Sequence, residues 1–418
     1  MKRHERASTF GEERGIYIPL LAIVFTAIIA VFSLGVDLGK MYIESLRQQR
    51  AADAATIVAA ASIGTFVGGS PLTKPEIEDL ARRVAEDNFV ANKVGYNVAL
   101  PADHILAEYD NGVSTIAVDT VVKYDSLFVG KITPGKSIWD IGGRAVAKRR
   151  PLNVTFVLDI TGSMDENADP ACVGAGCRKK MRALQDAAVT FVDKLDETKD
   201  RVAVVWFNEA AGTSYDLVPS PAPAGKHFDK NDVEASIRAL TPRNKTNIAL
   251  GLRQGRTAAS PVGLDQSAAK RVMILITDGA PNIVAPGFTM PCVRSNVEKQ
   301  AQVLAALESD LIRSDGITLF TIAVGPADPY VPGPSDINPD GAFQTFDDWY
   351  VIKRVLLTRV ANAYSQAAAY KEFPTDCIPS YDDIADKPAG QYLESPNAND
   401  LTSMLARLLK TIQMQLIE

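Results

Sequence analysis

The stretch from residue 15 to residue 36 contains no charged side chain, and most of its residues are hydrophobic. At about 1.5 Å per residue, this run is long enough to cross a hydrocarbon core roughly 30 Å thick. We therefore expect a single transmembrane helix at 15–36. Residues 1–14 should form a cytoplasmic tail, because four basic residues precede the run and basic flanks stay inside. A cleaved signal peptide is the alternative, but its apolar core would be shorter and would end at a small-residue cleavage site.

Apolar residues recur at three- and four-residue steps from residue 37 to about residue 66, so the helix is expected to continue beyond the span. Its second half, 51–61, is rich in alanine. Alanine favours helix and lets another helix approach closely, so this stripe fits either simple helix propensity or an assembly face. A second helix is expected at about 74–92.

The period changes to two between about residues 95 and 148. Apolar side chains alternate with polar ones around Val118 and Val122, and the Asp110-Asn111-Gly112 segment before them is typical of a hairpin turn. We therefore expect a small antiparallel sheet. Together with the preceding helix, it makes 37–150 an extracytoplasmic α+β linker module.

After residue 151, apolar runs of strand length alternate with helical stretches. This order predicts an α/β domain at 151–418 with a mainly parallel sheet covered by helices on both faces. An insertion is expected near 326–390, which is rich in Pro, Gly and Asp. The expected strands are 154–158, 202–207, 272–276, 317–324 and 391–393, and the expected helices are 181–195, 248–258, 297–313 and 399–416.

The sequence argues against two classes of function. The net charge of −6 and the lack of a basic stripe give no reason to expect nucleic-acid binding, and the clusters at 148–150 and 178–180 are interpreted as solvated ends of elements. The sequence holds only three histidines, at positions 4, 104 and 227, and neither a Gly-x-Ser-x-Gly nor a His-Glu-x-x-His motif. A metal-dependent hydrolase is therefore disfavoured, and we expect no enzymatic activity.

All four cysteines follow the predicted span. An even number in an exported domain favours disulfides, and we favour the pairs Cys172–Cys177 and Cys292–Cys377, although the sequence does not exclude other pairings. A zinc site is the alternative, but the spacing contains no C-x-x-C pair and no histidine lies near.

Oxygen-bearing side chains gather in three distant segments of the α/β domain. Asp159, Thr161 and Ser163 follow an apolar strand, Thr246 precedes a predicted helix, and Asp278 ends another strand. Ligands bind beyond the carboxyl ends of such strands. Two carboxylates and three hydroxyls suit a hard divalent cation, which usually keeps a position open for water or a partner.

The order and spacing of these five residues resemble the metal-ion-dependent adhesion site (MIDAS) of von Willebrand factor type A domains, which has the pattern Asp-x-Ser-x-Ser, then Thr, then Asp. The resemblance covers roughly 152–418 and departs only at Thr161, which keeps the hydroxyl. It implies a Rossmann-like fold, a bound Mg²⁺ (or Mn²⁺ or Ca²⁺) and adhesion through a partner's carboxylate. It also implies that the closing helix at 399–416 can shift when a ligand binds. The neighbouring Asp165 and Glu166 are either solvated loop charges or groups that tune the site.

Residues 14–66 resemble a second family. Arg14-Gly15, the long span, Val36-Asp37-Leu38-Gly39 and the run Ala51-Ala52-Asp53-Ala54-Ala55 are similar to the TadE/TadG-like N-terminal segment of Flp (tight adherence) pilus-assembly proteins. Joined to an A domain, this segment points to the TadG type. The position of the prepilin glutamate is taken by Leu20, so we do not expect a pilus subunit.

Together, the two resemblances imply a single-pass protein of the bacterial inner membrane, with most of the chain periplasmic or extracellular. Its partners would be other pilus-assembly components or a surface ligand. We therefore expect a metal-dependent binding protein for pilus assembly or adhesion. The alternative is a structural membrane tether of the pilus machine that binds nothing through metal.

Overall fold

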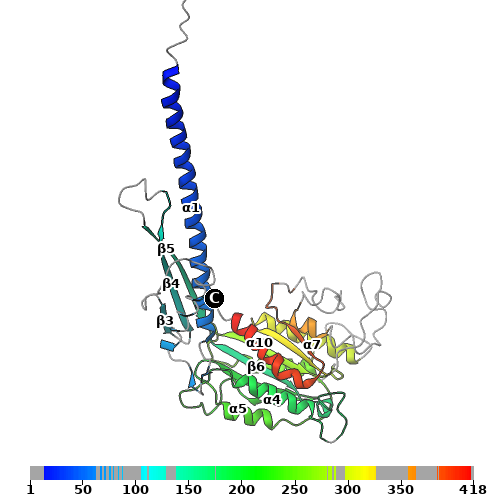
Figure 1. The fold of residues 1–418 in the computed structure, drawn as a ribbon. Helices are drawn as coiled ribbons and strands as arrows, with labels where there is room; N and C mark the ends of the chain where they lie inside the picture. Colours follow the sequence, from blue (N-terminus) through cyan, green and yellow to red (C-terminus); the bar gives the residue numbers. More distant parts are fainter. Residues whose placement is uncertain are drawn as a thin grey trace, which may run out of the picture. The chain divides into compact units, whose positions relative to one another are not determined.

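The computed structural model falls into two compact units. The first consists of Met1–Ser62, Thr73–Glu108 and Thr115–Ala147, and the second of Ile63–Leu72, Tyr109–Ser114 and Lys148–Glu418. Figure 1 shows the elements of both units. The structure describes residues 14–62, 66–67, 70–71, 105–110, 113–128, 138–174, 176–279, 297–325, 356–363 and 386–415, with a few isolated positions between them.

One continuous helix, α1, dominates the first unit. It runs over Arg14–Ser62, so the expected span and its continuation form a single element. Large apolar side chains are exposed along its first half, whereas residues spaced three or four apart are buried from Ser33 onward. The alanine stretch belongs to this covered face: Ala51, Ala52 and Ala55 are at most 1% exposed. The alanine stripe is therefore packed within this chain.

A three-stranded sheet in the order β3-β4-β5 belongs to the same part of the chain. Its strands are β3 (Ile105–Asp110), β4 (Val113–Asp125) and β5 (Ile138–Arg149). β3 and β4 are separated by two residues at the position of the predicted hairpin turn. The sheet packs closely on α1, because a Cβ at Gly143 would lie 2.6 Å from the Gln48 carbonyl carbon. The Thr120 hydroxyl donates a hydrogen bond to the Gln48 carbonyl at 3.2 Å.

The segment between α1 and this sheet is described only in part. The short strands β1 (Phe66–Val67) and β2 (Ser70–Pro71) pair antiparallel after α1 ends. Most of the helix expected at 74–92 lies outside the described residues.

The second unit is built on a six-stranded sheet in the order β11-β10-β9-β6-β7-β8. All neighbouring strands are parallel except β8, which pairs antiparallel with β7 at the edge. This confirms the predicted α/β sheet. The strands are β6 (Leu152–Asp159), β7 (Arg201–Phe207), β8 (Ala211–Tyr215), β9 (Lys270–Thr277), β10 (Thr318–Val324) and β11 (Tyr392–Ser395).

Helices cover both faces of this sheet (Figure 1). One hydrophobic core joins the sheet to α4, α5 and α10, and a second core joins the opposite face to α6 and α7. Every residue of the central strand β6 is buried, as expected for a strand between two helical layers. The helices are α4 (Lys180–Val192), α5 (Lys230–Arg238), α6 (Ile248–Ala259), α7 (Val297–Ser314) and α10 (Leu401–Gln415).

Two elements escaped the sequence-based prediction because their apolar signal is weak. The edge strand β8 has the sequence AGTSY and is only half-buried along its length. Helix α5 is mostly polar and buries only Val233 and Ile237, one turn apart. Tertiary pairing and packing, not local periodicity, account for both.

Part of the expected insertion at 326–390 is a layer of the domain. Residues 356–361 are helical, and Leu356, Leu357 and Val360 are fully buried in the core beside α6 and α7. The Leu357 carbonyl accepts a hydrogen bond from the Thr321 hydroxyl of β10 at 2.9 Å. This short apolar helix was hidden in a segment whose composition is otherwise typical of loops.

Helix α6 approaches the sheet closely through two glycines. A Cβ at Gly251 would lie 2.7 Å from Cγ of the Phe207 ring on β7. A Cβ at Gly255 would lie 2.6 Å from a methyl group of Val157 on β6. Gly251 faces a buried aromatic ring rather than the end of a flexible side chain. The Phe207 ring therefore has little room to move away from a larger residue at this position.

We expect Gly251→Val to lower the free energy of unfolding by about 3 kcal/mol, since overpacking a rigid core costs that order. The matched control is Thr257→Val, which places the same side chain on the exposed side of α6. Denaturant unfolding followed by tryptophan fluorescence measures both variants. Equal unfolding midpoints for the two variants would show that α6 tolerates a wider spacing from the sheet.

Candidate metal centre

Two carboxylates lie at one edge of the sheet because their strands are neighbours. Asp159 ends β6, and Asp278 directly follows the last residue of β9. The two strands run parallel, with Leu158 opposite Ile276. The carboxyl ends of parallel strands meet at one edge, which is where open α/β sheets bind ligands.

The turn after β6 brings the hydroxyls to this edge. A short 3-10 helix, Gly162–Asp165, starts directly behind Thr161. The Thr161 and Ser163 hydroxyl oxygens lie 3.1 Å apart, and Ser163 Oγ donates a hydrogen bond to Asp278 Oδ1 at 2.7 Å. The Thr161 backbone N–H donates to Asp159 Oδ1 at 2.8 Å. Four of the five residues singled out in the sequence thus form one hydrogen-bonded network.

The fifth residue, Thr246, reaches the same edge from the loop before α6. Asn244 adopts a positive φ of 66°, a conformation that asparagine tolerates, and its carbonyl accepts the Gly162 N–H at 3.1 Å. The Asn282 side chain accepts the Thr246 N–H at 3.0 Å. A Cβ at Gly279 would lie 3.5 Å from the Thr246 hydroxyl oxygen, so this hydroxyl lies beside the residue that follows Asp278.

Asp159 is completely buried beside a second carboxylate. Burial, and after it the negative charge of Asp278, raises the pKa of Asp159 to about 7. The Thr277 hydroxyl donates to Asp159 Oδ2 at 2.5 Å and favours the charged form in part. A cation between the two carboxylates would favour the charged form further, because opposite charge stabilises a buried carboxylate.

Lys180 corrects one expectation from the sequence, which had the cluster at 178–180 as a solvated end. Its side chain is only 8% exposed, and its ammonium contacts Asp278 Oδ2 at 2.8 Å and Glu166 Oε2 at 2.7 Å. Burial alone would lower the pKa of Lys180, but Asp278 and Glu166 raise it overall. The ammonium therefore stays charged and offsets part of the negative charge of the centre.

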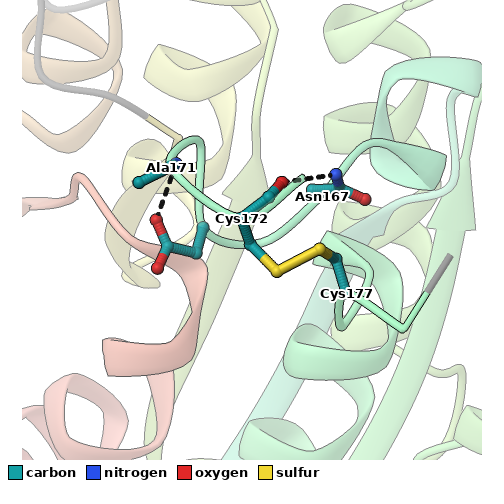
Figure 2. Close-up of a disulfide and its surroundings, with 5 residues drawn as sticks. Asn167, Ala171, Cys172 and Cys177 are labelled. Carbon is teal, nitrogen blue, oxygen red and sulfur yellow. Dashed lines mark hydrogen bonds between the residues drawn. A yellow bond between two sulfur atoms is a disulfide. The ribbon is translucent and has the colours of Figure 1, made fainter. Parts of the chain in front are cut away.

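A crosslinked loop places Lys180 at the start of α4. Cys172 and Cys177 form a disulfide with Cα atoms 5.9 Å apart, as expected from the sequence. Inside the loop, the Asn167 side chain donates to the Cys172 carbonyl at 2.9 Å (Figure 2). At its base, the Lys180 N–H donates to the Glu166 carbonyl at 2.9 Å. The second expected pair, Cys292–Cys377, lies outside the described residues.

The donor set fits a hard cation. Carboxylate and hydroxyl oxygens converge at the edge, and these are the ligands that Mg²⁺, Mn²⁺ and Ca²⁺ prefer. Across the part of the chain that the structure describes, no group of three or more His, Cys, Asp or Glu side chains is arranged to hold a metal ion. Hydroxyl oxygens, waters or a partner would therefore have to complete any coordination of an ion here.

Sequence reasoning missed three residues that shape this centre. Thr277 supports Asp159, Asn282 fixes the backbone of Thr246, and Lys180 pairs with Asp278. Thr277 looked like an ordinary strand residue, and Lys180 looked like an ordinary basic helix end. Only the position of Thr277 directly before Asp278 gave a signal that it would reach the site.

Two family models match the chain. Residues 153–333 match the von Willebrand factor type A domain, and residues 17–62 match the TadE/G-like family of Flp pilus assembly. None of the curated proteins matches the sequence.

Several solved structures are weakly similar to this chain. The PilB minor pilin from Streptococcus sanguinis is 16% identical with a TM-score of 0.43, covering 75% of this chain and 78% of the pilin. Proximal thread matrix protein 1 from the mussel byssus, with a zinc-occupied MIDAS motif, is 15% identical with a TM-score of 0.38. That match covers 63% of this chain and 48% of the mussel protein. BatB from Bacteroides thetaiotaomicron is 16% identical with a TM-score of 0.36, covering 63% of this chain and 99% of that protein.

All three TM-scores are below 0.5. The fold is therefore identified by the family match and the strand order. The domain match covers β6 and β9, whose ends carry Asp159 and Asp278, and the segment match covers most of α1. The chain therefore carries a TadE/G-like N-terminal segment followed by a von Willebrand factor type A domain, a combination consistent with a TadG-type pilus-assembly protein.

Proposed function

We propose that the protein is a membrane-anchored, metal-dependent binding protein of Flp pilus assembly. The hydrogen bond between Ser163 and Asp278, which lie 115 residues apart, carries this proposal. This bond joins the turn after β6 to the residue after β9, beside the buried Asp159. The proposed ligands are Asp159, Thr161, Ser163, Thr246 and Asp278.

The bound ion would supply a positive charge with an open position for a carboxylate oxygen of the partner. The chain's own residues would hold and orient it. Thr277 and the Thr161 N–H fix the Asp159 carboxylate, and Ser163 holds one oxygen of Asp278. Protein partners in pilus assembly are supported by the TadE/G-like segment. Both family matches are typical of binding and assembly proteins rather than enzymes.

Helix α1 supports the proposed anchor. Its large apolar side chains between Tyr17 and Val36 are exposed, from 45% to 77%. Among the described residues, it is the helix long and apolar enough to cross a membrane. We propose that 15–36 crosses the inner membrane once, with the 1–14 tail in the cytoplasm and the A domain outside it.

A structural tether is the second candidate, and Lys180 favours it. Its ammonium contacts Asp278 Oδ2 at 2.8 Å, so a positive charge of the chain itself balances this carboxylate. In that case the A domain would serve assembly through its shape alone.

We expect Asp278→Ala and Thr246→Ala to abolish Mn²⁺ or Mg²⁺ binding by the full-length protein in detergent, because each removes one proposed oxygen ligand. Isothermal titration calorimetry measures the affinity. Asp265→Ala is the matched control, because it removes an exposed carboxylate of the same domain and should bind the ion like the wild type.

Capture of pilus-assembly components by the wild type should be lost with chelator and with Asp278→Ala. Unchanged recovery of every component would contradict metal-mediated adhesion. Normal pilus formation by Asp278→Ala cells would favour the tether.

We expect Lys180→Met to tighten divalent cation binding by about tenfold or more. The variant removes the positive charge that contacts the proposed ligand Asp278 and would repel the cation. This repulsion is on the order of a kcal/mol or more at a site with little water. Lys180→Arg keeps the charge and should bind the ion like the wild type. Calorimetric titration of the three proteins with Mn²⁺ tests this. Equal affinities for the Met variant and the wild type would show that Lys180 does not oppose the ion.

A further inference from the structure

The connection after β4 is fixed to α1 at the end of the apolar run. Both carboxylate oxygens of Asp37 accept backbone hydrogen bonds, from the Leu127 N–H at 2.9 Å and from the Phe128 N–H at 3.0 Å. Asp37 is 1% exposed, so its charge is directed into the protein. Two adjacent N–H groups satisfying one carboxylate set both the height and the orientation of this connection along α1.

Packing against α1 begins inside the apolar run itself. Ser33, one turn before Asp37 on the same face, is only 7% exposed. Earlier residues of the helix, such as Ile28 and Ile29, are 46% and 61% exposed. The covered face therefore starts within the last turn of the proposed span.

Exposed apolar side chains lie near this level of the unit. Leu127 is 41% exposed, Phe128 43% and Ile138, at the start of β5, 52%. On the helix, Leu38 is 55% exposed and Tyr42 65%. We call these five residues the apolar collar. At about 1.5 Å per residue, Leu38 and Tyr42 lie roughly 3 and 9 Å past Val36 along the helix.

Leu38 lies at the depth of the polar boundary of a bilayer, which extends several ångströms beyond each side of the roughly 30 Å core, and Tyr42 lies at the outer side of that boundary. Aromatic residues such as Tyr prefer that boundary, and amphipathic surfaces bury apolar side chains there. We propose that the apolar collar lies in the lipid headgroup boundary, so that the β4 end and the β5 start rest on the membrane that α1 crosses. This inference depends on the proposed anchor at 15–36.

A lipid surface is favoured over a protein partner because the collar adjoins the exposed apolar surface of α1, which extends to Val36. The contact would fix the unit in rotation as well as in height. A helix alone can turn about its axis in a bilayer, whereas a sheet edge resting on lipid resists that rotation.

Photocrosslinking of the full-length protein tests this proposal. Benzoylphenylalanine replaces Ile29, Phe128 or Val146, and the protein is inserted into vesicles of phosphatidylethanolamine and phosphatidylglycerol. Val146 is 45% exposed on β5, similar to Phe128. It lies eight residues after Ile138, which is roughly 26 Å along an extended strand. After irradiation, mass spectrometry detects lipid adducts and gel electrophoresis detects crosslinked dimers.

Lipid adducts at positions 29 and 128, and none at 146, are the expected result. Loss of the adduct at position 29 would overturn the anchor itself. An adduct at 29 without one at 128 would overturn the collar while leaving the anchor in place. A dimer at 128 without lipid would assign the surface to a second copy.

A second variant tests the role of Asp37. Asp37→Ala removes the acceptor for the Leu127 and Phe128 N–H groups, so the lipid adduct at position 128 should fall while that at position 29 is kept. An unchanged adduct at 128 in this variant would show that the Asp37 carboxylate does not hold the collar at the membrane.

Discussion

Two carboxylates of like charge at the ends of adjacent strands impose the constraint that organises the second unit. Asp159 has no access to solvent, so hydrogen bonds and nearby positive charge must replace the water that would otherwise stabilise it. The chain answers with the Thr161 N–H and the Thr277 hydroxyl on Asp159, and with Ser163 and the Lys180 ammonium on Asp278. This charge balance explains the positions of three features: the 3-10 turn after β6, Thr277 at the end of β9 and Lys180 at the start of α4.

The second constraint is the close packing of helices on sheets, and it applies within each unit. Gly143 lets β5 reach the backbone of α1, and Gly251 lets α6 reach the Phe207 ring. In each case glycine is needed because a side chain would clash with the neighbouring atoms. The buried alanines of α1 act in the same sense, because a small side chain brings the helix near its covering sheet. Thus small residues set the spacing of layers, and polar residues set the chemistry at their edges.

The strands and helices with strong apolar periodicity could be predicted from the sequence. Strands β6 and β9 are examples, since continuous apolar runs indicate buried parallel strands. Strand β8 and helix α5 could not be predicted, because their residues are held by pairing and packing that local patterns do not encode. The five proposed ligands were recognisable from spacing, whereas Lys180 was not. Whether a lysine at a helix start points to solvent or to a carboxylate depends on the strand beside it.

The sheet order separates the two halves of the candidate centre by a long stretch of chain. Ser163 and Asp278 lie 115 residues apart, and Asp159 and Thr277 lie 118 apart. Contacts this remote carry a large loop-closure entropy, because the two ends of a long intervening chain must be brought together. A ribosome therefore delivers Asp159 well before the strand that completes its surroundings, while the disulfide spans only five positions and can close in an unfinished chain. Affinity for a cation at this edge would then act as a marker of completed folding, absent from any nascent or truncated form that lacks β9.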